Sequence, residues 1–518
     1  MTGLTPIALR ILAARAFEEL DRNRAIFDLP LRKFVFPDTP VEIHGRKALA
    51  PLGPSAGPHT QLAQNIALCW LGGARVMELK TVQILDRLTI PRPCIDVRGV
   101  GYNVEWSQEL TIEQSLEEYV KASMLIDLLA ARFRVERGTL FDVSVGYDLA
   151  GIRSERIVAF LRGMIDARPT IDLLRAELPL PLRSFNFTTN VASSVTLSTF
   201  HGCPPDEIEQ IADFLLTGIG LDVAIKLNPT LLGARDLFSI LHDRLGYTDV
   251  AVPATAFDHD PSFEQMLAIV GRLRDRARGL GRSFAIKLTN TLVVENRSEF
   301  LPRSEKLAYL SGCPLHVLAM HLVQRFRRAM PELPISFSAG IDRLNYPDAV
   351  LLGLRPVTVC TDLLKQGGYG RLRGYAEELA ERMKDAKPLT IDDYIAQLER
   401  DPRYRRERLP RTRRKRGAAL GLFDCATCDL CVELCPNDAL FRVPSRGQQK
   451  RKHQIVCFAD VCNDCGNCEA FCPDVGAPNW MKPRIFGDGR VEPRQAAIDV
   501  RAAVFDRSRI NYLNVENA

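Results

Sequence analysis

Residues 45–370 alternate between short apolar runs and longer segments whose apolar residues recur at helical spacing. The helical spacing is clearest in 205–217, 262–279 and 315–330. Nine runs are strand candidates: Lys47–Pro51, Arg75–Thr81, Phe141–Gly146, Ser194–Ser198, Asp222–Leu227, Asp249–Val252, Phe284–Thr289, Pro334–Ser338 and Val357–Thr361. Repeated strand–helix units predict a parallel sheet and fit a (β/α)8 TIM barrel better than an open sheet. Because a barrel takes eight strands, we expect 249–252 to be an insertion or no strand.

The same pattern divides the chain into five parts. Arg and Glu interrupt the apolar positions of residues 1–27, which predicts an amphipathic helix and not a signal peptide. No stretch approaches 18 consecutive apolar residues, so we expect no membrane span and a cytoplasmic protein. The predicted parts are an N-terminal helical extension (1–44), the barrel (45–400), a basic linker (401–418), a small α+β domain (419–482) and a C-terminal tail (483–518).

Composition adds two limits. Hydrophobic residues make up 46% and charged residues 25%, which is typical of a globular protein and argues against disorder, collagen or a coiled coil. The net charge is +5, yet residues 403–416 alone carry nine Arg or Lys and one Glu, so the remainder is about −3. This run is interpreted as a solvated linker or as a docking strip for an acidic partner or another subunit. It has no aromatic or motif context, so nucleic-acid binding is not predicted.

The cysteines point to metal chemistry, because nine of the 14 lie between 425 and 472. Two runs have the spacing C-x2-C-x2-C-x3-C-P, in which three thiolates bind one cluster and the fourth binds the other. We therefore predict one [4Fe-4S] cluster on Cys425, Cys428, Cys431 and Cys472, and a second on Cys462, Cys465, Cys468 and Cys435. Zinc would use CxxC pairs and would need neither the third nor the fourth cysteine. With no export signal, a disulfide framework is not expected.

Residues 419–480 resemble the bacterial-type two-cluster ferredoxins, whose clusters relay single electrons. The expected fold is therefore α/β, a TIM barrel followed by a small α+β ferredoxin domain. The ninth cysteine of the cluster region, Cys457, is expected to be a packing residue. The same is expected of the scattered cysteines Cys69, Cys94, Cys313 and Cys360.

Polar and small residues follow the predicted strands, where the chemistry of a barrel is placed. The segments are Gly53–His59, Glu78–Thr81, Gly146–Asp148, Ser198–Pro204, Lys226–Pro229, Lys287–Thr291, Ser338–Ile341 and Cys360–Asp362. Small residues let backbone N–H groups approach an anion, and lysine supplies positive charge. The last two strand ends are the usual phosphate site of this architecture.

In their order, the motifs GPSAGP, ELKT, KLNP, LTNT, SAGI and VCTD resemble the dihydroorotate and dihydropyrimidine dehydrogenase family of FMN barrels. A barrel followed by two clusters is similar to the dihydropyrimidine dehydrogenase arrangement. GPHTQLAQN, ELKTVQILDRL, LSTFHGCPPDEIE and KLNPTLLG resemble, more closely still, bacterial proteins named as selenate reductase subunits. The resemblance covers about 45–480 and implies FMN as a cofactor beside the two clusters.

The resemblance also implies roles for individual residues. Ser55 and Ala56 would lie near the flavin ring, with Lys80 and Thr81 beside them. Lys226 would lie near flavin N1, where a cation stabilises the reduced flavin. Thr289 and Asn290 would contact the ring or the ribityl chain, Asn103 would contact substrate, and the phosphate would be held by Ala339, Gly340, Thr361 and Asp362. Asp148 stands where an amide is expected.

The proton donor is the least determined of these assignments. In the family a cysteine in the loop after strand four exchanges the substrate proton while flavin N5 moves hydride, and a thiol suits that task. Here the matching tripeptide is Ser198–Phe200, and Cys203 falls four residues after Thr199. Cys203 is the leading candidate for the acid, with Thr199, His201 and His59 as alternatives.

We therefore expect an iron–sulfur flavoprotein oxidoreductase subunit that passes electrons between the clusters and FMN. Its substrate would be a small unsaturated molecule, pyrimidine- or purine-like by resemblance. No GxGxxG motif follows a strand, so electrons should come from a partner. The candidates are an FAD-containing, NAD(P)H-oxidising protein of the glutamate-synthase small-subunit type, or a ferredoxin, and we expect an oligomer. One alternative is a non-catalytic electron-transfer scaffold. Another is a lyase with a Schiff base on Lys226 or Lys80.

Overall fold

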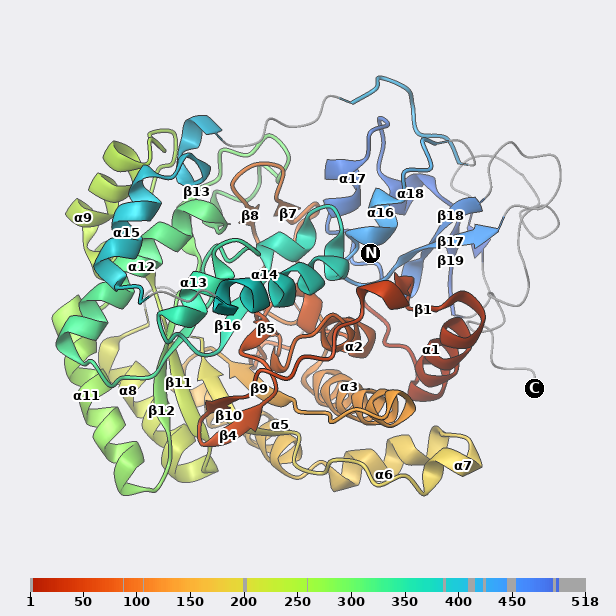
Figure 1. Ribbon diagram of the computed structural model, residues 1–518, viewed down its shortest axis with the longest axis horizontal. Coiled ribbons are helices and arrows are strands. Elements are labelled where there is room, and N and C mark those ends of the chain that lie inside the picture. Colours follow the sequence, from red (N-terminus) through yellow and green to blue (C-terminus); the bar gives the residue numbers. More distant parts are fainter. Residues whose placement is uncertain are drawn as a thin grey trace.

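The computed structural model of the chain describes residues 3–86, 88–105, 107–198, 203–258, 260–384, 388–408, 415–422, 425–444, 453–487 and 491–492 (Figure 1). Eight parallel strands form its central sheet, in the order β5-β16-β15-β12-β11-β10-β9-β6. Their bounds are β5 Leu52–Pro54, β6 Val76–Glu78, β9 Leu140–Val145, β10 Ala192–Leu197, β11 Asp222–Leu227, β12 Phe284–Leu288, β15 Ile335–Phe337 and β16 Val357–Val359. The N–H of Arg75 donates to the carbonyl of Leu52 at 2.8 Å, which brings the edge strands together. The predicted TIM barrel is confirmed, and it is nearly closed.

Two strand predictions need comment. Residues 249–252 form no strand, as expected of the surplus candidate. The first barrel strand lies later than the predicted Lys47–Pro51: Arg46–Ala48 is β4, which pairs with β3 (Val41–Ile43) in an antiparallel hairpin. The reason is burial, because Lys47 is exposed whereas every residue of β5 is buried.

Helices alternate with these strands and cover the outside of the barrel (Figure 1). Capping boxes start two of them, Thr111 with Gln114 before α3 and Ser262 with Gln265 before α11. The N-terminal helix α1 is amphipathic as predicted, with Leu9 on its buried face. The longer helices are α1 Leu9–Asn23, α2 Ala63–Leu71, α3 Ile112–Phe133, α5 Glu155–Ile165, α6 Arg168–Glu177, α8 Pro205–Phe214, α11 Phe263–Gly279, α12 Cys313–Ala329, α14 Leu372–Lys384 and α15 Ile391–Arg400. The shorter ones are α4 Leu149–Ile152, α7 Leu180–Arg183, α9 Ala234–Phe238, α10 Thr255–Asp258 and α13 Tyr346–Leu351.

A second, antiparallel sheet lies at the carboxyl end of the barrel strands. Its order is β13-β14-β8-β7, with bounds Leu292–Glu295, Leu307–Leu310, Tyr102–Asn103 and Ile95–Asp96. Its strands come from the loops after β6 and β12, and Tyr309 pairs with Asn103 in register. This sheet therefore forms a cover over the rim where the sequence gathers its polar residues.

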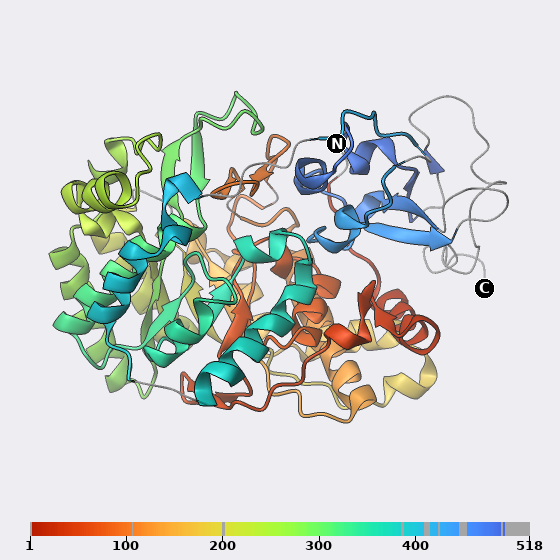
Figure 2. The same cartoon turned by 45° about the horizontal axis from the view of Figure 1, so that its top comes forward.

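The C-terminal domain has its own sheet, β17-β18-β19-β20, with bounds Leu440–Pro444, His453–Phe458, Arg484–Ile485 and Val491–Glu492. Short helices α16 (Leu430–Glu433), α17 (Asn467–Phe471) and α18 (Pro478–Met481) pack with it, and Cys457 is buried in its core. The domain lies beside the barrel, next to α1 and α2 (Figure 2). Arg15 pairs with Asp438 at 2.6 Å, and Asn65 donates to Asn437 at 3.0 Å.

The predicted domain limits stay predictions, and the linker residues 409–414 and most of 483–518 lie outside the described residues. Among the helices that the structure describes, none combines the length and the apolar character that a bilayer crossing requires.

Candidate active site and cysteine groups

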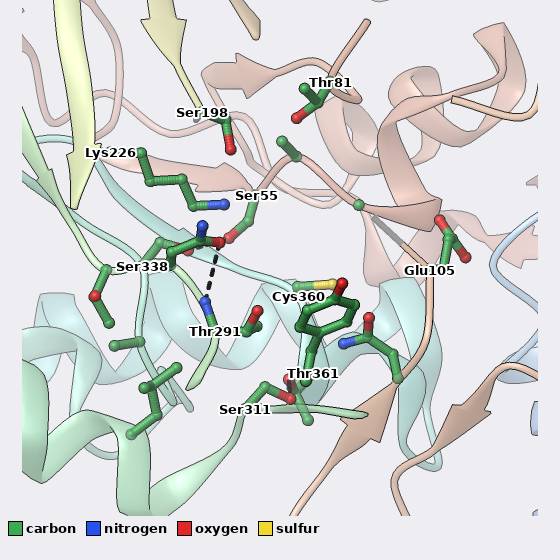
Figure 3. Close-up of a pocket in the computed structure, with 18 of the residues that line it drawn as sticks. Ser55, Thr81, Glu105, Ser198, Lys226, Thr291, Ser311, Ser338, Cys360 and Thr361 are labelled. Atoms are coloured by element: carbon green, nitrogen blue, oxygen red, sulfur yellow. Dashed lines mark hydrogen bonds between the residues drawn. The ribbon is translucent and has the colours of Figure 1, made fainter. Parts of the chain in front are cut away.

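A cavity of about 730 Å³ opens at the carboxyl ends of the barrel strands, beneath the second sheet (Figure 3). The parallel arrangement brings strand ends that are distant in sequence to one rim. Eleven residues predicted from the sequence line the cavity: Ser55, Ala56, Lys80, Thr81, Asn103, Lys226, Thr289, Asn290, Ala339, Gly340 and Thr361. Two predicted site residues, Asp362 and Cys203, do not.

Three lysines lie in or below this cavity, and they differ in their partners. Lys80 forms an ion pair with Glu105, and Lys287 with Glu78. Lys226 extends into the cavity and, among the described residues, has no hydrogen bond or ion pair (Figure 3). Burial, and then the positive charge of Lys287, lowers the pKa of Lys226 to about 8. A cation without a counter-ion suits an electron-rich or anionic group in the cavity, as the flavin assignment requires.

The end of the cavity around Gly340 is built from close backbone approaches. Gly340 has φ +53°, and a Cβ there would lie 2.2 Å from the carbonyl oxygen of Gly312. A Cβ on Gly312, which has φ +79°, would lie 2.0 Å from the carbonyl oxygen of Val100. Gly312 immediately precedes the 17-residue helix α12, and Leu315 in its first turn lines the cavity. A helix N-terminus beside glycine backbone favours an anion, so the residues present fit a phosphate group.

Asp362 lies behind this rim and not on it. Its carboxylate accepts hydrogen bonds from Arg371 at 2.7 and 2.8 Å and from Tyr375 at 2.9 Å. Thr361, the preceding residue, lines the cavity and donates to Ser311 at 3.0 Å. The chain turns at this point, so consecutive side chains point in different directions. The carboxylate of Asp362 thus holds the loop through these hydrogen bonds, and its contact with phosphate stays a prediction.

The proposed proton donor is buried beside the cavity without lining it. Burial, and then the charge of Glu207, raises the pKa of Cys203 to about 12, so the thiol keeps its proton at neutral pH. Thr199 and His201 lie outside the described residues. His59 is buried against Tyr369, and burial lowers its pKa to about 3. The role of Cys203 stays a prediction.

Sequence reasoning missed two groups that line the cavity. Cys360, expected to be a packing residue, contributes its thiol to the wall, and burial raises its pKa to about 11. Glu105 is the partner of Lys80, and Glu105 in turn contacts Cys94 at 3.9 Å. The place of Cys360 at the end of β16 was a usable signal, since every other strand end supplies the same rim.

The cysteines of the two C-x2-C-x2-C-x3-C-P runs lie in two groups, and their role as cluster ligands stays a prediction. Cys425, Cys428, Cys431 and Cys472 line one small pocket. In the other group, burial and the charges of Cys465, Cys462 and Cys435 raise the pKa of Cys468. Within the described residues no three His, Cys, Asp or Glu side chains converge on a site for a single ion. A cubane takes one thiolate on each of four irons, so its ligands stand further apart.

The second group lies against the wall of the large cavity. The carbonyl of Cys465 accepts hydrogen bonds from the N–H groups of Cys94 at 3.0 Å and Ile95 at 3.2 Å, and Ile95 lines the cavity. Asn467 donates to the carbonyl of Leu364 at 2.9 Å, and Leu364 also lines the cavity. In the first group, by contrast, Cys428 is exposed. The first group thus reaches the protein surface, and the second lies against the cavity.

Comparison with known proteins gives a family match over most of the chain. The family described as "Oxidoreductase YgfK, N-terminal TIM-barrel domain" matches residues 27–406. The YgfK proteins of Escherichia coli strain K12 and of E. coli O157:H7 are each 40% identical over 407 residues, which is 73% of this chain. The chain spans 39% of the length of these relatives.

Two further proteins are more distantly similar. The ketoisovalerate oxidoreductase subunit VorC of Methanothermobacter marburgensis is 30% identical over 54 residues, which is 10% of this chain and 67% of that protein. A crystal structure of ligand-free DHODH from Eimeria tenella has a TM-score of 0.46 and 18% identity, and the match covers 76% of this chain and 98% of that one.

Proposed function

We propose, because the chain belongs to the family of YgfK oxidoreductases defined by their N-terminal TIM-barrel domain, that it is an iron–sulfur flavoprotein oxidoreductase subunit. It would pass electrons between two [4Fe-4S] clusters and FMN and thereby reduce, or oxidise, a small unsaturated molecule. The proposal depends above all on one observation: the cysteine group that contains Cys465 lies against the wall of a cavity, and Lys226, which has no hydrogen bond or ion pair among the described residues, extends into that cavity.

FMN, when bound, would exchange hydride with the substrate and single electrons with the clusters. The residues of the cavity suit it. The ammonium of Lys226 would stabilise negative charge on the ring, while the backbone around Gly340, the hydroxyl of Thr361 and the N-terminus of α12 would hold the phosphate. Ser55, Ala56, Lys80, Thr81, Thr289 and Asn290 would line the ring and the ribityl chain.

The substrate would lie between the ring and the covering sheet. Asn103 on β8 and Tyr309 on β14 line the cavity from that side, and both present hydrogen-bonding groups of the kind that a pyrimidine- or purine-like molecule requires. Cys203, with its retained proton, would serve as the general acid. Cys360, unlike Cys203, lines the cavity and would be the alternative acid.

Electrons would enter at the exposed side of the first cysteine group and continue through the second. The first cluster would be bound by Cys425, Cys428, Cys431 and Cys472, and the second by Cys462, Cys465, Cys468 and Cys435. The donor would be an FAD-containing, NAD(P)H-oxidising protein or a ferredoxin that docks beside Cys428. The chain spans 39% of the length of its curated relatives.

Anaerobic purification with cofactor analysis tests the proposal. Released flavin should be FMN at near-unit occupancy, and electron paramagnetic resonance of the reduced protein should show two interacting [4Fe-4S] clusters. Cys428→Ala should lose one cluster, whereas the matched variant Cys457→Ala should keep both. Absence of FMN would refute catalysis on flavin and favour the alternative of an electron-transfer scaffold.

A further inference from the structure

The interior of the barrel contains charged side chains where such barrels usually carry branched apolar residues. Glu78 on β6 and Lys287 on β12 are 2% and 1% exposed and form an ion pair. A buried ion pair adds little stability compared with an apolar pair of the same size. The position of this pair therefore calls for an explanation other than the stability of the fold.

A chain of hydrogen bonds joins the pair to the active-site cavity. The hydroxyl of Thr358 donates to Glu78 at 2.9 Å and accepts from Lys287 at 3.2 Å. Ser55 donates to Thr358 at 3.1 Å and shares a 2.6 Å hydrogen bond with Ser338. Ser55, Ser338 and Thr358 all line the large cavity, which Lys226 also lines (Figure 3).

On the other side, Glu78 lines a second cavity of about 270 Å³, at the amino end of the strands. Polar groups surround it: Asp142 accepts hydrogen bonds from Ser194 at 2.6 Å and from Thr196 at 2.5 Å, and all three line it. The exposed residue Lys47 also lines this cavity, so it reaches the surface. At about 30 Å³ for each water molecule, its volume and polar lining suit several waters.

We propose that the barrel axis is a proton path, from the second cavity through Glu78, Thr358 and Ser55 to the active-site cavity. The inference rests on the proposed function. Reduction of the substrate consumes two electrons and two protons: the electrons come from one-electron carriers through the clusters, and the protons come from water. Two bonds to hydrogen form on the substrate, and the carriers are oxidised.

The groups along the path have the properties that proton transfer needs. Each hydroxyl both donates and accepts, so Thr358 and Ser55 can pass a proton on by reversing their hydrogen bonds. Burial, followed by the charge of Glu78, raises the pKa of Asp142 to about 6, which suits exchange with water near neutral pH. Lys287 forms the ion pair with Glu78, and its positive charge also acts on Asp142. Lys226 interacts electrostatically with Glu78. The other charged or titratable residues that line the second cavity are His44, Arg46, Lys47 and Arg137. Cofactor and substrate would fill the active-site cavity, which leaves the barrel axis as the route for protons.

Thr358→Val tests the path, since it removes one hydroxyl and leaves the Glu78–Lys287 pair in place. Thr358→Ser restores the hydroxyl, and Thr230→Val, a buried threonine that bonds Asp260 away from the axis, is the matched control. The holoprotein is reduced anaerobically in weakly buffered solution while flavin absorbance and a pH-indicator dye are followed together. Thr358→Val should slow proton uptake about tenfold or more, and Thr358→Ser and Thr230→Val should not.

Infrared difference spectra between oxidised and reduced protein give a second readout. A carboxyl band that Glu78→Gln removes should shift in Thr358→Val and stay unchanged in Thr230→Val. Normal flavin bleaching with unaltered proton uptake in Thr358→Val would refute the path alone. Wild-type protein that shows no flavin bleaching would refute the proposed function, and the path with it.

Discussion

Replacement of Lys287 by methionine tests the energetics of the charged barrel interior. The substitution keeps the length and most of the volume of the side chain but removes the ammonium. Glu78 is then left with only hydroxyl donors, Thr358 at 2.9 Å and Ser336 at 3.5 Å. Breaking one side of a buried ion pair costs about 3–5 kcal/mol, because the remaining charge is uncompensated. We expect Lys287→Met to lower the free energy of unfolding by that amount.

The double variant Glu78→Leu/Lys287→Met separates two contributions to the free energy of unfolding: the loss caused by a buried unpaired charge and the net contribution of the ion pair. With both charges removed it should be more stable than either single variant, and near the wild type. Lys384→Met, which breaks the exposed pair with Glu381, is the control and should change stability by about 1 kcal/mol or less.

Urea unfolding of the anaerobically prepared protein at pH 7, followed by pulse proteolysis, measures these differences. A loss below about 1 kcal/mol for Lys287→Met would show that the pair is not desolvated as its burial implies. A double variant less stable than both single variants would refute the view that the pair serves function and not stability.

Three further predictions concern the site. In thermal unfolding, the flavin-free wild type should become more stable as the pH rises from about 8 to 10.5. Over this range Lys226 has released its proton in the folded protein but still holds it in the unfolded chain. Lys226→Met should lack this gain. Cys203→Ala should lower the rate of substrate reduction about 100-fold while flavin reduction by the clusters continues. If instead Cys360→Ala lowers that rate and Cys203→Ala does not, the general acid is Cys360. Cys465→Ala should slow electron transfer from donor to flavin, and paramagnetic resonance should show that one cluster remains; retention of both clusters would contradict its assignment as a ligand.

The alternation of apolar runs was sufficient to predict the barrel because strands buried on both faces are predominantly apolar, even where charged residues such as Glu78 and Lys287 interrupt them. It failed at the first strand, where Arg46–Ala48 and Leu52–Pro54 lie close together in the sequence. A hairpin at the amino end of the barrel and a barrel strand have similar local composition. Only packing against both neighbouring strands distinguishes them.

The sequence alone was sufficient to group residues by their spacing and by their position at the end of a strand. In each run the cysteines separated by two residues come together in one group, and the fourth cysteine joins the other group. Residues that follow parallel strands share one rim. Only the tertiary structure decided which side chains form ion pairs and which line the cavity. Among the described residues Lys80 and Lys287 pair with carboxylates and Lys226 with none, and Cys360 lines the cavity whereas Cys203 and Asp362 do not. Lys287 and Glu78 are 209 residues apart, and at such a separation only the closed barrel decides which charges meet.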